Sequence, residues 1–414
     1  MSPDRACGVR EVAELTAMTA AAHKASVDTS STRPWRVTVQ GAAALAAAMG
    51  VGRFVYTPIL PLMHAQAGLS VQQGTELATA NYLGYLVGAL VGIASPRTMR
   101  SPTTLRLSLA VVVATLALMP TKEDFAGWFV LRLVAGAASA LVFVAAVGAL
   151  FGALRGQGPH LAGWALGGIG AGIALSGALA LVVHGANGWR LTWWLAATLC
   201  AALTIVAWRL PMPAGTSSGT TLDASEPGRA GAFDARFGFL LTAYALEGVG
   251  YIVAGTFLVA AIDQDSARWV GSGAWVLAGC AALPSSALWA RLARTWPRPM
   301  LLATALLLQA AGVALPTVIG GTCAALISAA AFGATFVGIS TLALAHGSAS
   351  GVPRAAAILT TGYSLGQIAG PLLVTPVLHN GYRQALMIAA LVLIFAAATS
   401  VFAQRRGRLV VGGE

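Results

Sequence analysis

The sequence predicts an all-α membrane protein with twelve transmembrane helices, arranged as two parallel, pseudo-symmetric six-helix bundles. Three observations support this fold class. Hydrophobic residues fill 57% of the 414 positions, charged residues fill only 9%, and related glycine-rich motifs recur half a chain apart. Soluble domains carry about 25% charged residues, so this much apolar sequence requires lipid as its main surroundings.

Twelve apolar stretches are long enough to cross a bilayer as helices, which takes about 17–25 residues each. The first six lie near 37–63, 71–94, 103–120, 126–151, 160–183 and 190–210. The second six lie near 237–261, 270–292, 299–317, 320–346, 354–378 and 382–403. The chain therefore divides into two sets of six helices.

The domain organisation follows from these spans. The segment between the two sets is rich in Pro, Gly, Ser and Thr, which is typical of a flexible linker. The first 35 residues contain charges and no continuous apolar stretch, so they are not expected to be a cleavable signal peptide. The predicted units are a disordered cytoplasmic tail over 1–35, an N-terminal bundle over 36–210, a cytoplasmic linker over 211–236, a C-terminal bundle over 237–403 and a cytoplasmic tail over 404–414.

Basic residues predict the orientation, because cytoplasmic loops are enriched in Lys and Arg. With both termini inside, the inner segments hold nineteen of the 25 basic residues. The outer loops hold four: Lys122, Arg190, Arg268 and Arg383. The abundance of Arg, Ala and Gly is typical of a GC-rich bacterial genome. We therefore expect a multi-pass protein of the bacterial inner membrane with both ends in the cytoplasm.

Two pairs of motifs indicate an internal repeat. The helix-1 segment 50–55 (GVGRFV) matches the helix-7 segment 248–253 (GVGYIV) at an offset of 198. The helix-5 segment 163–169 (GWALGGI) matches the helix-11 segment 362–368 (GYSLGQI) at an offset of 199. Both halves begin on the same side of the membrane, so the repeat is parallel. Such halves are expected to hold a substrate site between them.

The strings over 50–63 (GVGRFVYTPILPLM), 247–251 (EGVGY) and 366–371 (GQIAGP) make the chain similar to a known family. They resemble the YbfB/YjiJ-type branch of the major facilitator superfamily, and the resemblance covers roughly 36–403. It implies a transporter whose two bundles expose a central site to each side of the membrane in turn.

Other signatures of the superfamily are partial. Arg132 with Gly136 in helix 4 resembles the superfamily's Arg-containing motif, which is linked to proton coupling. The loop between helices 2 and 3 keeps Arg97 and Arg100 but lacks the family's acidic residue. Helix 5 is rich in glycine but has no Gly-Pro pair, so the antiporter motif is incomplete and the direction of transport stays open.

Three ionisable residues lie well inside the predicted spans: Arg53, Arg132 and Glu247. Such residues are costly in a membrane and usually functional. We predict that Glu247 is a proton-coupling carboxylate, because desolvation opposes its charge. Arg53 is predicted to bind a substrate anion or to pair with Glu247. The alternative is a permanent Arg53–Glu247 pair that only satisfies two buried charges. Arg132 takes part in proton coupling or tethers helix 4 to its neighbours.

A polar and aromatic lining accompanies these charges. Tyr244, Glu247 and Tyr251 share one helical face by their spacing, and further polar residues lie on helices 1, 2 and 11. Such a lining suits a small organic solute, although each residue taken singly fits interhelical hydrogen bonding equally well. The predicted substrate-binding residues are Arg53, Tyr56, Thr57, Asn81, Tyr85, Tyr244, Tyr251 and Gln367.

Composition and motifs argue against several other functions. The basic residues occupy short loops, so the net charge of +11 does not predict a nucleic-acid partner. The sequence has no Walker-type loop and no HExxH or similar pattern. It also offers no nucleophile–base group, so we expect no enzyme activity, no metal and no cofactor.

We therefore predict a monomeric, proton-coupled secondary transporter of a small organic solute, with a slight preference for export. The alternative is an uptake symporter for an anionic or zwitterionic metabolite. A transport-dead membrane sensor and a membrane-embedded enzyme are remote alternatives. The predicted partners are the small-molecule substrate, protons and the lipid bilayer.

Overall fold

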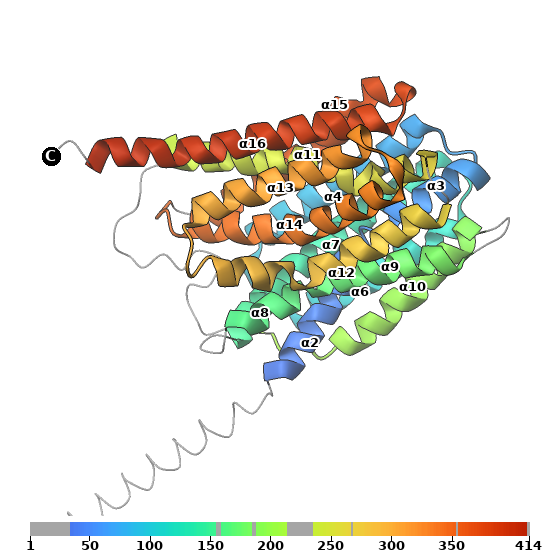
Figure 1. Cartoon of the computed structure of the whole chain (residues 1–414). Helices are drawn as coiled ribbons and strands as arrows, with labels where there is room; N and C mark the ends of the chain where they lie inside the picture. Colours follow the sequence, from blue (N-terminus) through green and yellow to red (C-terminus); the bar gives the residue numbers. More distant parts are fainter. Residues whose placement is uncertain are drawn as a thin grey trace, which may run out of the picture.

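The computed structural model describes residues 34–154, 159–183, 188–212, 235–265, 268–352 and 355–411. Within these ranges the chain is helical and contains no β-strand. Twelve of its helices are long and apolar enough to cross a membrane, and they run along a common direction (Figure 1). The predicted fold class and the number of spans are confirmed.

The first six spans are formed by ten elements. Span 1 is α2 (Pro34–Leu45), the π-helix η1 (Ala46–Val51) and α3 (Tyr56–Gln66); span 2 is α4 (Val71–Ala94); span 3 is α6 (Pro102–Leu118) with the 3₁₀-helix η2 (Met119–Thr121); span 4 is α7 (Phe125–Ala153); span 5 is α8 (Pro159–Leu166) with α9 (Gly168–Val182); span 6 is α10 (Gly188–Ala207). The short α5 (Pro96–Met99) lies in the loop after span 2.

The second six spans are simpler. Spans 7 to 10 are α11 (Ala235–Asp265), α12 (Arg268–Leu292), α13 (Arg298–Val318) and α14 (Gly321–Ser348). Span 11 is α15 (Ala355–Val374) with the 3₁₀-helix η3 (Thr375–Asn380), and span 12 belongs to α16 (Tyr382–Val411). Because α16 continues to Val411, most of the predicted tail over 404–414 is helical. The predicted tail over 1–35 and the predicted linker lie almost wholly outside the described residues.

Local sequence explains where these helices begin. Span 2 starts at a capping box: the Gln73 N–H donates to Ser70 Oγ at 3.1 Å, and the Ser70 N–H donates to Gln73 Oε1 at 3.0 Å. Span 4 starts where the Gly127 N–H donates to the Asp124 carboxylate at 2.6 Å. Both contacts satisfy N–H groups that a helix start leaves free.

Corresponding helices pack in corresponding pairs in the two halves. In the first half α4 and α6 pack on α7, and in the second half α12 and α13 pack on α14. Glycines permit the closest approaches: a Cβ at Gly136 would lie 2.0 Å from the Asn81 carbonyl oxygen of α4. The halves meet along α9 and α12, where a Cβ at Gly279 would lie 2.1 Å from the Ala174 nitrogen. Small residues at helix contacts are typical of membrane proteins.

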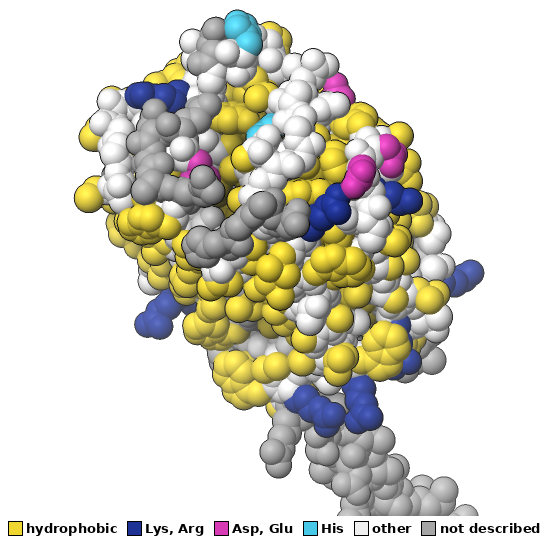
Figure 2. Space-filling view, turned by 90° about the vertical axis from the view of Figure 1, so that its right-hand side faces the viewer, with side chains coloured by type: hydrophobic (Ala, Val, Ile, Leu, Met, Phe, Trp, Pro, Cys, Tyr) yellow, Lys and Arg dark blue, Asp and Glu magenta, His cyan; other side chains and the backbone are white. Residues whose placement is uncertain are grey.

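The outer surface is apolar. Large hydrophobic side chains such as Leu107, Ile205 and Phe395 are more than half exposed. Figure 2 looks onto the end of the molecule where α3 ends and α16 begins, and hydrophobic side chains dominate the visible surface, with only scattered charges. An exposed apolar surface of this extent is what lipid-facing helices require.

Candidate functional site

The first span is interrupted at its centre. In η1 and just after it, the Gly52 N–H donates to the Ala47 carbonyl at 2.8 Å and the Phe54 N–H donates to the Met49 carbonyl at 3.3 Å. Each of these bonds joins residues five apart in the sequence, which is the π-helical pattern often found at functional sites. The chain then turns through four residues before α3 begins.

This interruption releases the carbonyl group of Arg53 from the helical ladder. The Thr57 N–H donates to the Phe54 carbonyl at 3.2 Å, and Pro58 has no N–H to offer. The Arg53 carbonyl instead accepts a long hydrogen bond from Nη2 of Arg132 at 3.4 Å. A side chain of span 4 therefore supports the broken backbone of span 1.

Arg132 ties three helices of the first half together. Its guanidinium group lies 4.6 Å from the ring centre of Tyr56, and its carbonyl accepts from Nδ2 of Asn81 at 3.0 Å. The Tyr56 hydroxyl donates to the Gly74 carbonyl at 2.9 Å. Arg132 is buried, and its Nε and Nη1 atoms have no hydrogen-bond partner among the described residues. Contacts within the first half therefore join Arg132 to Tyr56 and Asn81.

Arg53 lies at the boundary between the halves and reaches into the second. Its Nη2 donates to Oε1 of Gln367 in α15. Its guanidinium group lies 4.2 Å from the ring centre of Tyr85, 5.2 Å from that of Tyr82 and 5.5 Å from that of Phe54. Arg53 is only 2% exposed. The structure therefore holds a buried cation on aromatic faces, a recognised stabilising arrangement.

Glu247 is fully buried in α11, at 0% exposure. The Gln309 side chain of α13 lies close enough to interact with its carboxyl group, but the two do not meet in a hydrogen bond of standard geometry. Both carboxyl oxygens lack another partner among the described residues. Tyr244 and Tyr251 both stack on Tyr363, with ring centres 4.5 and 5.7 Å apart. This common neighbour confirms that Tyr244 and Tyr251 share a face of the helix.

Arg53 and Glu247 do not pair. Among the described side chains, the ion pair found within 4.0 Å is Arg190–Glu123 at 2.5 Å, at the exposed end of the molecule. Arg53 contacts the neutral amide of Gln367 instead. The permanent Arg53–Glu247 pair that was one interpretation of the sequence is therefore not formed, since the two side chains have different neutral neighbours.

An aromatic cup faces Arg53 from the second half; we define it as Tyr251, Trp275, Phe332 and Phe336. The Phe54 ring enters this cup edge-on, with ring centres 6.3 Å from Tyr251, 6.5 Å from Trp275 and 6.3 Å from Phe336. Within the cup the rings of Tyr251, Phe332 and Phe336 stack at 5.3–5.9 Å. Edge-to-face and offset-stacked rings are the favoured geometries.

Further hydrogen bonds join the halves on the α3 side of Arg53. They are Thr57 Oγ1 to the Gly255 carbonyl at 2.5 Å, Tyr82 Oη with Thr256 Oγ1 at 2.6 Å, and Tyr382 Oη with His64 Nε2 at 3.1 Å. At the other end of span 1, α2 packs on α7, α8, α9 and α10 of its own half. Side-chain hydrogen bonds between the halves therefore gather toward the end that the sequence predicts to face outward, while at the other end α8 packs on α12.

Several of the predicted substrate-binding residues come together in the structure. Arg53, Tyr85, Tyr251 and Gln367 gather where the halves meet, and Thr57 forms a closing contact beside them. Sequence reasoning missed the partners that surround them: Phe54, Tyr82, Trp275, Gln309, Phe332, Phe336 and Tyr363. The four-residue spacing of Phe332 and Phe336 was a detectable signal, but it does not distinguish a site from ordinary packing.

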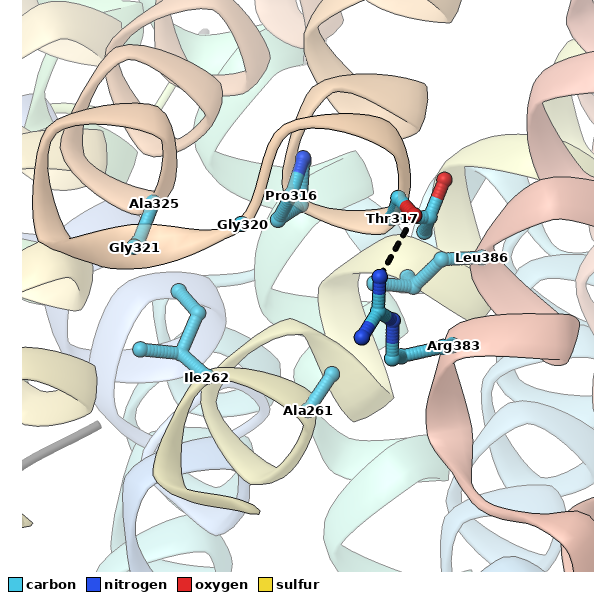
Figure 3. A pocket seen from close by; sticks show the side chains of 9 residues that line it. All are labelled: Ala261, Ile262, Pro316, Thr317, Gly320, Gly321, Ala325, Arg383 and Leu386. Atoms are coloured by element: carbon cyan, nitrogen blue, oxygen red, sulfur yellow. Dashed lines mark hydrogen bonds between the residues drawn. The ribbon is translucent and has the colours of Figure 1, made fainter. Parts of the chain in front are cut away.

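A small pocket near the α3 end is separate from this site. Figure 3 shows its lining, drawn mainly from α11, α13, α14 and α16, with Nη2 of Arg383 donating to the Thr317 carbonyl at 2.7 Å. None of the predicted site residues lines it. Among the described residues, no group of three or more His, Cys, Asp or Glu side chains is placed to hold a metal ion. The centre of the bundle is therefore the candidate site.

Comparison with known proteins gives one family. The chain matches none of the curated proteins with which it was compared. A family model described as "Uncharacterised MFS-type transporter YbfB" matches residues 45–401, which include every site residue discussed above. With most of its length covered and twelve membrane-spanning helices, the chain belongs to the YbfB family of MFS-type transporters.

Proposed function

We propose that this transporter couples the movement of a small organic solute to that of protons, by alternating access between its two halves. The single observation that carries the proposal is Glu247: a fully buried carboxyl group with no cation within 4.0 Å among the described residues. Ionisable groups in membrane interiors mark proton or substrate pathways. Glu247 lies near the rings of Tyr244 and Tyr363 and one helical turn from Tyr251, whose ring contacts Phe54 of the first half.

The chemistry of Glu247 and Gln309 supports proton exchange. A neutral carboxyl group and an amide are complementary, because each offers one donor and one acceptor to the other. Both carboxyl oxygens of Glu247 and both amide atoms of Gln309 lack a hydrogen-bond partner among the described residues, so nothing there compensates a negative charge on Glu247. An unpaired buried charge costs several kcal/mol. A closed centre therefore favours a proton on Glu247, and an open centre hydrates the group and lets the proton leave.

Alternating access supplies the motion. The closing contacts made by Thr57, Tyr82 and His64 must separate for the α3 end to open, while the glycine-lined contact of α9 with α12 keeps the halves in register. We propose export as the direction, because helix 5 is rich in glycine, as in the antiporter motif that it partly resembles. Uptake of an anionic metabolite is the second candidate, favoured by the unpartnered nitrogens of Arg53 and Arg132.

A proton-flux screen tests the proposal. The protein is reconstituted into liposomes that contain a pH-sensitive dye, and anionic, zwitterionic, cationic and neutral solutes are added in turn to the outside. At least one class is expected to change the internal pH faster than in protein-free liposomes. Export and uptake are separated by comparing right-side-out with inverted membrane vesicles. The absence of a solute-dependent proton flux for all four classes contradicts the proposal.

A further inference from the structure

Phe54 occupies the aromatic cup in the way that a flat ligand would. Its ring belongs to the first half, yet three rings of the second half hold it edge-on. Nε1 of Trp275, in the wall of the cup, has no hydrogen-bond partner among the described residues. The cup therefore offers aromatic rings to whatever fills it, with an unpartnered N–H donor on one of its residues.

Arg53 lies beside the ring that fills the cup, and Arg132 supports the Arg53 backbone from span 4. The Arg53 guanidinium group lies 5.5 Å from the Phe54 ring centre, and its Nε is unpartnered among the described residues. Nε and Nη1 of Arg132 are unpartnered as well, and neither arginine has a carboxylate within 4.0 Å in the described part of the chain. Burying a cation without a counter-charge is costly. An anionic group next to the cup would offset that cost.

We propose, on the basis of the transport function above, that the substrate is a small aryl carboxylate. Its ring takes the place of Phe54 in the aromatic cup, and its carboxylate pairs with Arg53 in place of the neutral Gln367 amide. The guanidinium fork matches a carboxylate in a bidentate pair. One carboxylate on Arg53 and one proton on Glu247 occupy different places, so the two ions do not compete for a single group.

An aryl amine is the competing substrate class, because Glu247 lies one helical turn before Tyr251 of the cup. Arg53, however, stands between the halves at the rim of the cup and would repel an ammonium group there. The Nε atom of Arg53 and the Nε and Nη1 atoms of Arg132 also have no hydrogen-bond partner among the described residues, so these donors are available to an anion. The balance of charge at the cup is therefore positive and favours the carboxylate.

Binding to the purified protein in lipid nanodiscs tests this assignment without requiring transport. The probes are phenylacetate, phenethylamine and acetate, measured by isothermal titration calorimetry. Phenylacetate is expected to bind at least about tenfold more tightly than either of the others, because only it offers both ring and anion. Tighter binding of phenethylamine, or equal binding of acetate, overturns the proposal.

Two pairs of variants sharpen this experiment. Arg53→Gln is expected to weaken the binding of phenylacetate at least about tenfold, whereas Arg190→Gln at the exposed end leaves the affinity unchanged. Phe54→Ala removes the ring that fills the cup and is expected to raise the affinity for phenylacetate severalfold. Phe151→Ala, on the exposed surface, is expected to leave the affinity unchanged. Arg53→Lys provides a second test if Arg53→Gln loses its helical circular dichroism. Unchanged phenylacetate affinity in a folded Arg53 variant overturns the assignment.

The outcome separates the substrate class from the transport function. If phenylacetate fails to bind while another solute drives proton flux, the substrate class is wrong and the transporter stands. If phenylacetate binds through Arg53 but none of the solutes drives proton flux, the site is correct and proton-coupled transport is wrong.

Discussion

Helix 1 and helix 7 carry related glycine motifs but opposite chemistry. Helix 1 breaks at Arg53, because the ladder slips through a π-helix and Pro58 has no N–H. Helix 7 runs unbroken as α11, and the residue at the matching offset of 198 is Thr256, which keeps its N–H. The broken helix places a fixed cation between the halves, and the continuous helix holds a carboxyl group near aromatic rings. In the proposed function, the first half binds the charge of the substrate and the second half binds the proton.

The largest expected effect on the binding side of this comparison comes from Arg53→Gln. Loss of the charge and of the contact with Gln367 is expected to reduce solute transport about 10- to 100-fold, since a hydrogen bond to a charged group contributes about 1.5–3 kcal/mol. The transport rate of Arg53→Lys is expected to lie between those of wild type and Arg53→Gln, because lysine keeps the positive charge but lacks the two parallel N–H donors of the guanidinium group. Initial transport rates in liposomes measure both. Normal transport by Arg53→Lys would reduce Arg53 to a structural counter-ion.

Pro58→Thr tests whether the break itself matters, since it gives helix 1 the residue found in helix 7. The new N–H can join the ladder, so the variant is expected to unfold at a higher temperature while its transport rate falls about tenfold. Pro316→Ala, within α13 and away from the centre, is the matched control and is expected to transport normally. A Pro58→Thr protein with full transport shows that the break is not needed.

The smallest expected effect comes from the closing contact of Thr57. Thr57→Val keeps the size of the side chain but removes the hydrogen bond to the Gly255 carbonyl, and a neutral bond of this kind contributes about 1 kcal/mol. The transport rate is expected to change about two- to fivefold. Thr304→Val, whose hydroxyl bonds only within its own exposed turn, serves as control. Equal transport rates in the two variants would show that the hydrogen bond from Thr57 to the Gly255 carbonyl does not control opening of the α3 end.

Hydropathy and periodicity were sufficient to predict the twelve spans, because lipid imposes a fixed length and an apolar composition on each helix. The same costs of burial identified Arg53, Arg132 and Glu247 as exceptional. The contacts between helices were harder to predict from the sequence. Successive side chains on a helix point about 100° apart, so a contact between helices depends on how each helix is rotated about its axis. Periodicity on helix 1 therefore does not reveal that Arg53 reaches Gln367.

The aromatic cup illustrates the same limit. Phe332, Phe336 and Trp275 lie on apolar helices where aromatic residues are ordinary, and only the packing of α11, α12 and α14 brings them around Phe54. Pro58 has no N–H to continue the ladder of helix 1, but the π-helix before it has no marker in its run of alanines. Helix crossing and rotation, which arise from the packing of both halves together, decide these contacts.

The central claim is that Glu247 carries the coupled proton while Arg53 does not. It is tested most directly by measuring, in the same liposomes, solute exchange without a gradient and solute accumulation driven by a pH gradient. Wild type and Glu76→Gln, which alters a half-buried acid at the start of α4, are expected to do both. Glu247→Gln is expected to exchange solute but not to accumulate it, since glutamine fills the same space and cannot release a proton. Accumulation by Glu247→Gln at the wild-type level would contradict the account.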